Sequence, residues 1–178
     1  SGVGDAIDLS WKLTGTLQGW GGPGLLASYE IERRQIGGRN VDASRHASRG
    51  RRAWRAAYRP DIRDDTPAGA ATRDNLAAIA NVEQRKSNEM IGAELGYRYE
   101  GSPIVWQEPG EGPSHDFMSY VPTTWPGARL PHVWLEDGRA LHDLIGEGYT
   151  LLRLSGTGDA APLAQAFAAY RAPFTVLE

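Results

Sequence analysis

The feature that most constrains the fold of this 178-residue chain is a change of sequence texture at Gly96. Before it, apolar residues recur at three- and four-residue spacing, which is the period of helices. After it come short aromatic or β-branched runs bounded by Gly, Pro and Asp, a pattern typical of strands. We therefore expect an α/β protein overall, with an N-terminal helical segment over 1–95 and a small mixed-sheet α/β domain over 96–178.

The helical segment is predicted to be divided by its glycines. A helix is expected over 5–18, because its apolar residues share one face, and the stretch GWGGPG ends it. That face consists of Ala6, Leu9, Leu13 and Leu17. A second helix is expected from Gly24, interrupted or bent at 37–38, with an arginine-rich third helix after it. Beyond the turn-rich stretch PDIRDDTPAG, helical spacing resumes as far as residue 95.

The second half predicts short strands alternating with short helices. Strands are expected at YRYEGSPIVW, LPHVWLED, YTLLRL and FTVLE. The stretches GRALHDLIG and DAAPLAQAFAAY between them predict helices.

Residue usage excludes several kinds of chemistry. With no cysteine, the chain can form no disulfide, thiolate metal site or thiol nucleophile. The four histidines lack the spacing of a metal site, so no metal is expected. No serine lies in a strand-turn-helix nucleophile context, which leaves hydrolase chemistry without support and no residue assigned as catalytic.

Charge is distributed unevenly along the chain. The net charge is −3, yet Arg33 to Arg63 holds ten arginines against Asp42 and Asp61. Such a stretch could grip phosphates, or it could be a solvated or inter-domain face. Because no nucleic-acid module accompanies the charge, no nucleic-acid partner is expected. No apolar run reaches the roughly 20 residues of a membrane span and no signal pattern opens the chain, so a soluble, cytoplasmic protein is expected.

Three short motifs near the start carry a family resemblance. They are Gly2-Val3-Gly4-Asp5-Ala6, Trp11-Lys12-Leu13 and Tyr29-Glu30-Ile31-Glu32-Arg33-Arg34. Their order resembles the segment just after the flavin site in FAD-dependent aromatic-ring hydroxylases, the class A flavoprotein monooxygenases of the phenol hydroxylase and 3-(3-hydroxyphenyl)propionate hydroxylase type. The later stretches LGYRYEGSPIV and PTTWPGARLPHVWLEDGRALHDLIGEGYTLLRL are similar to the carboxy-terminal thioredoxin-like domain of these enzymes.

The resemblance implies a cofactor, a co-substrate and a substrate class. Such an enzyme uses FAD and NAD(P)H to insert one oxygen atom into a phenolic ring. Ser1, Gly2 and Val3 would flank the flavin, because a helix amino terminus favours the negative charge of the reduced ring. Glycine there lets the backbone approach closely. A homodimer is left open.

The chain also departs from the family pattern. The glycine-rich nucleotide fold, the Gly-Asp pair and the Gly-x-Asn turn that build most of the family's FAD site are missing. We therefore expect the carboxy-terminal part of a longer enzyme, which alone would be inactive and would not retain FAD. Its thioredoxin-like domain is expected to be incomplete at its C-terminus and, without cysteine, redox-inert.

Two alternatives stay open. The chain could be a stand-alone binding or assembly module with no enzyme behind it. It could also bind a nucleotide through Gly156–Ala161, since a strand, a G-x-G-x-x-A loop, a helix, a second strand and Glu178 follow in the order of a dinucleotide-binding unit.

Overall fold

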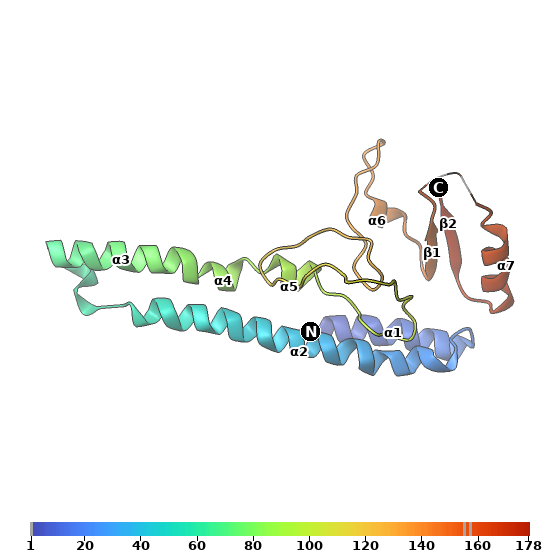
Figure 1. The fold of residues 1–178 in the computed structure, drawn as a ribbon, viewed down its shortest axis with the longest axis horizontal. Coiled ribbons are helices and arrows are strands. Elements are labelled where there is room, and N and C mark those ends of the chain that lie inside the picture. The colour runs from blue at the N-terminus through green and yellow to red at the C-terminus, as the bar shows by residue number, and fades with distance from the viewer. Residues whose placement is uncertain (1, 155, 157) are drawn as a thin grey trace. The chain divides into compact units, whose positions relative to one another are not determined.

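The computed structural model describes residues 2–154, 156 and 158–178 (Figure 1). The chain forms two compact units. One comprises Ser1–Arg33, Glu100–Gln107 and Leu130–Glu178, and the other comprises Arg34–Tyr99 and Glu108–Arg129. These units are defined by contacts between residues, and they do not test the domain boundary expected near residue 96, which stays a prediction.

The first unit begins with a helical hairpin. Helix α1 (Gly2–Gln18) is joined by a four-residue turn to α2 (Pro23–Ala56), whose first eleven residues belong to this unit. The turn is tight, because the N–H groups of Trp20 and Gly21 both donate to the carbonyl of Gly15. Gly19 takes a φ of +79°, a conformation that glycine adopts without steric cost. The helix end predicted at GWGGPG is confirmed.

The end of the chain contributes a β-α-β motif to the same unit. Strands β1 (Tyr149–Leu152) and β2 (Phe174–Leu177) pair in parallel, and α7 (Ala161–Ala169) connects them. A short helix, α6 (Leu141–Leu144), precedes β1. In the described part of the chain these two strands form the whole sheet.

The second unit is mainly helical. The rest of α2 is followed by the 3₁₀ helix η1 (Pro60–Arg63), then α3 (Pro67–Glu83), α4 (Arg85–Asn88) and α5 (Ile91–Leu95). Helix α3 starts where the sequence favours it, since the Thr66 hydroxyl accepts a hydrogen bond from the Gly69 N–H at 3.1 Å. Gly50 lies against the backbone of α3, where a Cβ would come within 2.3 Å of the Glu83 carbonyl oxygen.

Several predicted elements are wrong. The interruption at 37–38 does not occur, because α2 runs unbroken through both glycines. The strands predicted at 97–106 and 130–137 do not form, and the described residues there make only isolated bridges, Arg98 with Ala128 and Trp134 with Ala140. Proline in both stretches removes a backbone N–H that a sheet ladder would need. The helix-rich α/β class is confirmed, while the thioredoxin-like domain stays a prediction.

Burial in this structure favours polar side chains to an unusual degree. The largest fully buried side chains are Lys12, Glu32 and Ser28. Fully buried lysine and glutamate are rare unless they are paired. The partners of these charged groups therefore define the most specific site in the first unit.

Candidate functional site

The predicted flavin-flanking residues lie at the start of α1. Ser1 is outside the described residues, Gly2 opens the helix, and the side chain of Val3 is 77% exposed. A Cβ added to Gly2 would have no atom within 4 Å. The first backbone N–H groups of a helix have no intrahelical acceptor, so an exposed first turn can donate to an anionic group.

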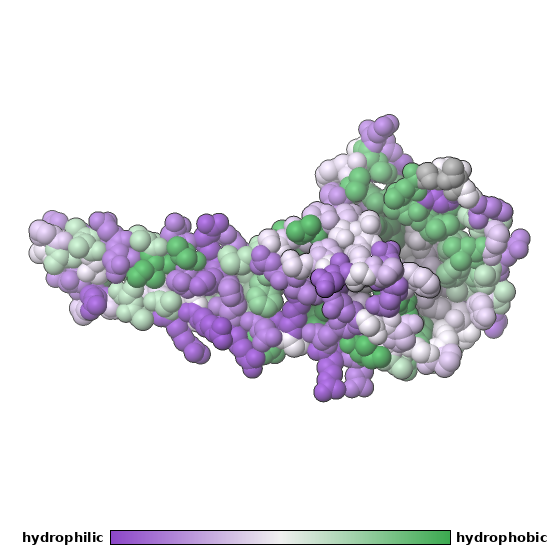
Figure 2. All heavy atoms as spheres, in the orientation of Figure 1, coloured by the Kyte–Doolittle hydropathy of each residue, from purple (hydrophilic) through white to green (hydrophobic). Residues whose placement is uncertain are grey.

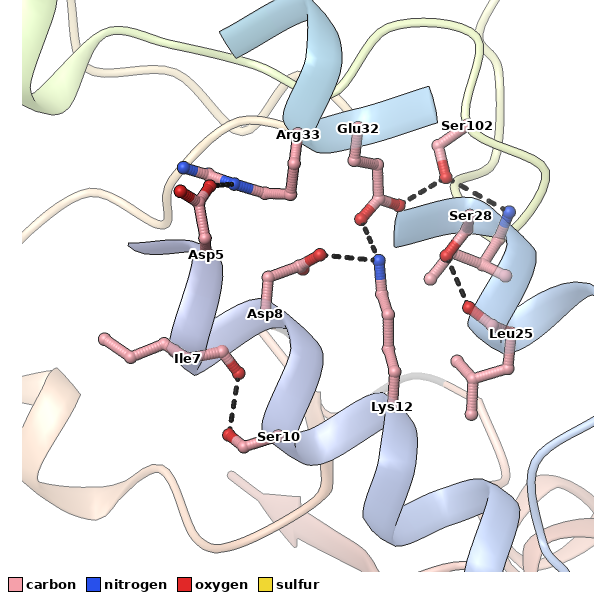
Figure 3. Close-up of polar contacts among 11 residues, drawn as sticks. Asp5, Ile7, Asp8, Ser10, Lys12, Leu25, Ser28, Glu32, Arg33 and Ser102 are labelled. Atoms are coloured by element: carbon pink, nitrogen blue, oxygen red, sulfur yellow. Dashed lines mark hydrogen bonds and ion pairs between the residues drawn. The ribbon is translucent and has the colours of Figure 1, made fainter. Parts of the chain in front are cut away.

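An ion pair fastens this first turn to α2. Arg33 Nε donates to Asp5 Oδ1 at 2.8 Å, and the arginine side chain is only 7% exposed (Figure 3). Gly4 makes room for the guanidinium group, because a Cβ at that position would lie 2.9 Å from Arg33 Nη2. A larger residue at this position would therefore make the arginine side chain shift.

Behind the ion pair lies a buried ionic network. Lys12 Nζ donates to Asp8 Oδ2 at 2.9 Å and to Glu32 Oε2 (Figure 3). The other oxygen of Glu32 accepts a hydrogen bond from the Ser102 hydroxyl. All four side chains are at most 5% exposed, so one ammonium group serves two carboxylates away from water.

Because of this network, α1 buries charged side chains and exposes apolar ones, the opposite of the usual surface helix. Helix α1 buries Asp8, Lys12 and Gly15, whereas Ile7 and Leu17 on its other side are 65% and 85% exposed. The helix predicted over 5–18 is confirmed, but its apolar face is not the face that it buries. Burial of the charges is tolerated because each one has an oppositely charged partner.

Sequence reasoning found the motif residues but missed the network. The i, i+4 spacing of Asp8 and Lys12 is a signal for an ion pair on one helix face. Nothing in the sequence links Lys12 to Glu32 and Ser102, which lie 20 and 90 residues further along the chain. Only the fold brings them together.

The proposed nucleotide-binding loop precedes α7. The predicted order of strand, loop, helix and strand is confirmed, although Thr157 in the loop lies outside the described residues. Arg153 is bonded at both ends of this motif, to the Gly158 carbonyl oxygen at 2.9 Å and to the Glu178 carboxylate. The carboxylate that a ribose hydroxyl would need is therefore engaged by an arginine.

The histidines show a contact that their spacing did not predict. The rings of His132 and His142 stack with centroids 5.9 Å apart and an interplanar angle of 13°. Within the described residues, no three His, Asp or Glu side chains gather in a way that could hold a metal ion.

The arginine-rich half of α2 is largely exposed in this chain. Figure 2 shows hydrophilic side chains over much of this half of α2, and a mixture of hydrophilic and apolar side chains over α3. Arg45 pairs with Asp42 at 2.9 Å, and both side chains are more than 60% exposed.

As for membranes, none of the helices in 2–154, 156 and 158–178 has both the length and the apolar character needed to cross one.

Known proteins resemble this chain in both sequence and structure. The family model of an FAD binding domain matches residues 1–44, which hold α1, the Asp5–Arg33 pair and three members of the buried network. The FAD-dependent monooxygenase apdD of Emericella nidulans is 33% identical over 163 residues. Residues 1–44 thus match the FAD binding domain family, and the chain as a whole is similar to a segment of FAD-dependent monooxygenases.

Other relatives agree with this family. The phenol 2-monooxygenase of a Pseudomonas species is 29% identical over 183 residues. The rebeccamycin biosynthetic enzyme RebC, solved with reduced flavin, matches 99% of this chain with a TM-score of 0.81 and 35% identity. The chain spans 25% of apdD, 29% of the phenol 2-monooxygenase and 32% of RebC. The chain thus corresponds to about a quarter to a third of each of these relatives.

Proposed function

We propose that this chain is the carboxy-terminal part of an FAD- and NAD(P)H-dependent monooxygenase that hydroxylates a phenolic aromatic substrate. In this proposal Ser1, Gly2 and Val3 flank the flavin, and residues 96–178 form a thioredoxin-like domain without redox function. The chain alone is structural, does not retain FAD and is inactive.

One observation supports the flavin contact more than any other. The first turn of α1 is open at Gly2 and Val3, while the next residues of the same helix are fixed by the Asp5–Arg33 pair. Because the helix is already fixed, its open first turn can contact a planar ring without a change in the protein. Donors held in place in this way stabilise negative charge on the ring more effectively. The family model that matches residues 1–44 describes an FAD binding domain, which supports the same contact.

The start of α1 has space for a flavin ring. The open side of Gly2 leaves space for a ring at the helix terminus. When bound, FAD supplies the oxygen-activating chemistry and NAD(P)H the reducing equivalents. The contribution of this chain is to direct the N–H groups of the first turn of α1 at the negative charge of the reduced flavin.

The test uses the protein expressed from its complete coding region. We expect it to be yellow and to oxidise NAD(P)H faster when a phenol is added. Val3→Glu places a carboxylate at the exposed first turn, and we expect it to weaken FAD binding at least tenfold and to lower the flavin reduction potential, because it repels the reduced ring.

The matched control is Ser10→Glu. It adds the same charge two turns along α1, at an exposed position outside the first turn, and should leave the affinity and the potential unchanged. A wild-type protein that binds no flavin would overturn the proposed function, and equal effects of both variants would overturn the placement of the first turn. Tight FAD binding by the 178-residue chain alone would contradict its structural role.

A further inference from the structure

We propose that the buried network of Asp8, Lys12, Glu32 and Ser102 sets the axial register of α1 on α2, and that Lys12 is thereby a positioning residue for the first turn of α1. The register is a property of this chain. Its use in holding the first turn at the flavin rests on the proposed function above.

Two ionic contacts of opposite polarity cross from α1 to α2. At residue 5 the acid lies on α1 and pairs with Arg33, whereas at residue 12 the base lies on α1 and pairs with Glu32. Asp5 and Lys12 are two helical turns apart, about 10 Å along the axis, yet their partners are neighbours in sequence. The pairing thus fixes α1 at two points against one short segment of α2.

Each one-turn slip of α1 would break this pairing. If α1 moved so that Asp8 took the place of Lys12, two carboxylates would meet at Glu32, buried from water. If α1 moved the other way, Thr16 would take that place and Glu32 would lose its ammonium partner. In the same movement Leu9 would replace Asp5 beside Arg33. Buried charges that penalise both neighbouring registers are a known device for specifying one arrangement.

Apolar packing contributes to this interface mainly at one end, where Leu25 of α2 and Trp20 lie against Gly15. The central contact face of α1 consists of Asp8, Lys12 and Gly15, and the large apolar side chains Ile7 and Leu17 lie on its exposed side. Ser102, which comes from a segment 70 residues beyond Glu32, holds the second carboxylate oxygen and so fixes the side chain that Lys12 meets. We therefore assign the register mainly to the charges.

The direct test measures the register in this chain. Because the chain has no native cysteine, spin labels can be placed at the exposed positions Ile7→Cys on α1 and Ile31→Cys on α2. The wild-type network should give one narrow distance distribution. In the triple variant Asp8→Leu, Lys12→Met and Glu32→Leu we expect a distribution that is broadened or shifted by about one turn, roughly 5 Å.

A second variant and a control complete the design. Glu32→Gln keeps the volume and can still bond Ser102 but removes the charge, and it should broaden the distribution as well. The control, Asp42→Leu with Arg45→Met, removes an exposed ion pair of α2 and should change nothing. An unshifted, narrow distribution in either network variant that folds would overturn the proposal. Loss of folding in both variants would assign the network to stability alone and would overturn it too.

A separate measurement tests the link to the flavin. In the complete protein, the triple variant should bind FAD at least tenfold more weakly and at a lower reduction potential, with unchanged helix content. A shifted register with wild-type flavin affinity and potential would overturn the positioning role and leave the register intact. A wild-type protein without flavin would instead refute the proposed function, so the two failures are distinguishable.

Discussion

Lys12 is the residue on which the burial of two carboxylates depends. Its ammonium group is the cation that contacts both Asp8 and Glu32, and its side chain is fully buried. Replacing a whole buried ionic cluster with apolar residues is often neutral for stability, whereas removing one partner leaves an uncompensated buried charge. Single and combined substitutions should therefore differ sharply.

We expect Lys12→Met to lower the free energy of unfolding by about 3–5 kcal/mol, because two carboxylates lose their counter-charge. Chemical denaturation followed by circular dichroism measures the loss. The control Arg45→Met breaks an exposed pair and should change stability by less than about 1 kcal/mol. Equal effects of the two substitutions would contradict the burial argument.

Asp116 is a residue whose ionisation depends on its local hydrogen bonds. The Ser119 hydroxyl donates to its Oδ2 at 2.6 Å and the Met118 N–H to its Oδ1 at 2.8 Å, and these bonds lower the pKa of the Asp116 carboxyl below its usual value. A lowered pKa stabilises the fold above the usual carboxyl pKa, and this contribution is lost as the pH falls through the lowered value. Ser119→Ala should raise the pKa of Asp116, which carboxyl NMR titration measures. An unchanged titration would show that the Met118 N–H suffices.

At the scale of elements, the glycines of α2 divide into two kinds. A Cβ on Gly37 or Gly38 would meet no atom within 4 Å, whereas a Cβ on Gly50 would collide with the Glu83 carbonyl oxygen. Glycine lowers helix stability by about 1 kcal/mol relative to alanine where no packing requires it. Gly37 and Gly38 therefore lower the stability of α2 without a packing role, whereas Gly50 is needed for packing against α3.

We expect Gly37→Ala and Gly38→Ala each to stabilise the protein by up to about 1 kcal/mol. Gly50→Ala should destabilise it, because the backbone of α3 would have to move away. Thermal unfolding of the three variants measures both signs. A stabilising Gly50→Ala, or a destabilising Gly37→Ala, would contradict this division.

The same elements show how far the sequence predicts the fold. Helical periodicity located α1, and the parallel strands β1 and β2 were recognised from their β-branched and aromatic residues. The break at Gly37 was wrong because a helix tolerates glycine where the neighbouring residues propagate it. The buried face of α1 was not predicted, because apolar spacing carries no information about ion pairs made with another helix.

At the scale of the whole molecule, the chain exposes large apolar side chains on α1. Val3, Ile7 and Leu17 are 65–85% exposed, and clustered exposed apolar residues mark interaction surfaces. We expect the 178-residue chain to bind an environment-sensitive hydrophobic dye, and the triple change Val3→Lys, Ile7→Lys and Leu17→Lys to reduce dye fluorescence severalfold with the helix content retained. Val41→Lys, at an exposed position of α2, is the control. Undiminished fluorescence in the triple variant would place the dye elsewhere.

The candidate site was only partly accessible from the sequence. The resemblance named Ser1, Gly2 and Val3, and the motif residues Lys12, Glu32 and Arg33 were recognised without their contacts. Their convergence needs the α1–α2 turn and a serine from a distant segment. Contacts across such separations are set by tertiary structure, which single-residue patterns do not encode.

The wide sequence separation within the buried network also implies an order of assembly. The α1–α2 hairpin joins neighbouring residues through a short turn, so its helices and the Lys12–Glu32 pair can meet early, before most of the chain has collapsed. Ser102 can reach the remaining glutamate oxygen only after a loop of 70 residues has closed, which is slower. The hydrogen bond from the Ser102 hydroxyl would then form late in folding. Until it forms, one carboxylate oxygen of Glu32 would lack its protein partner.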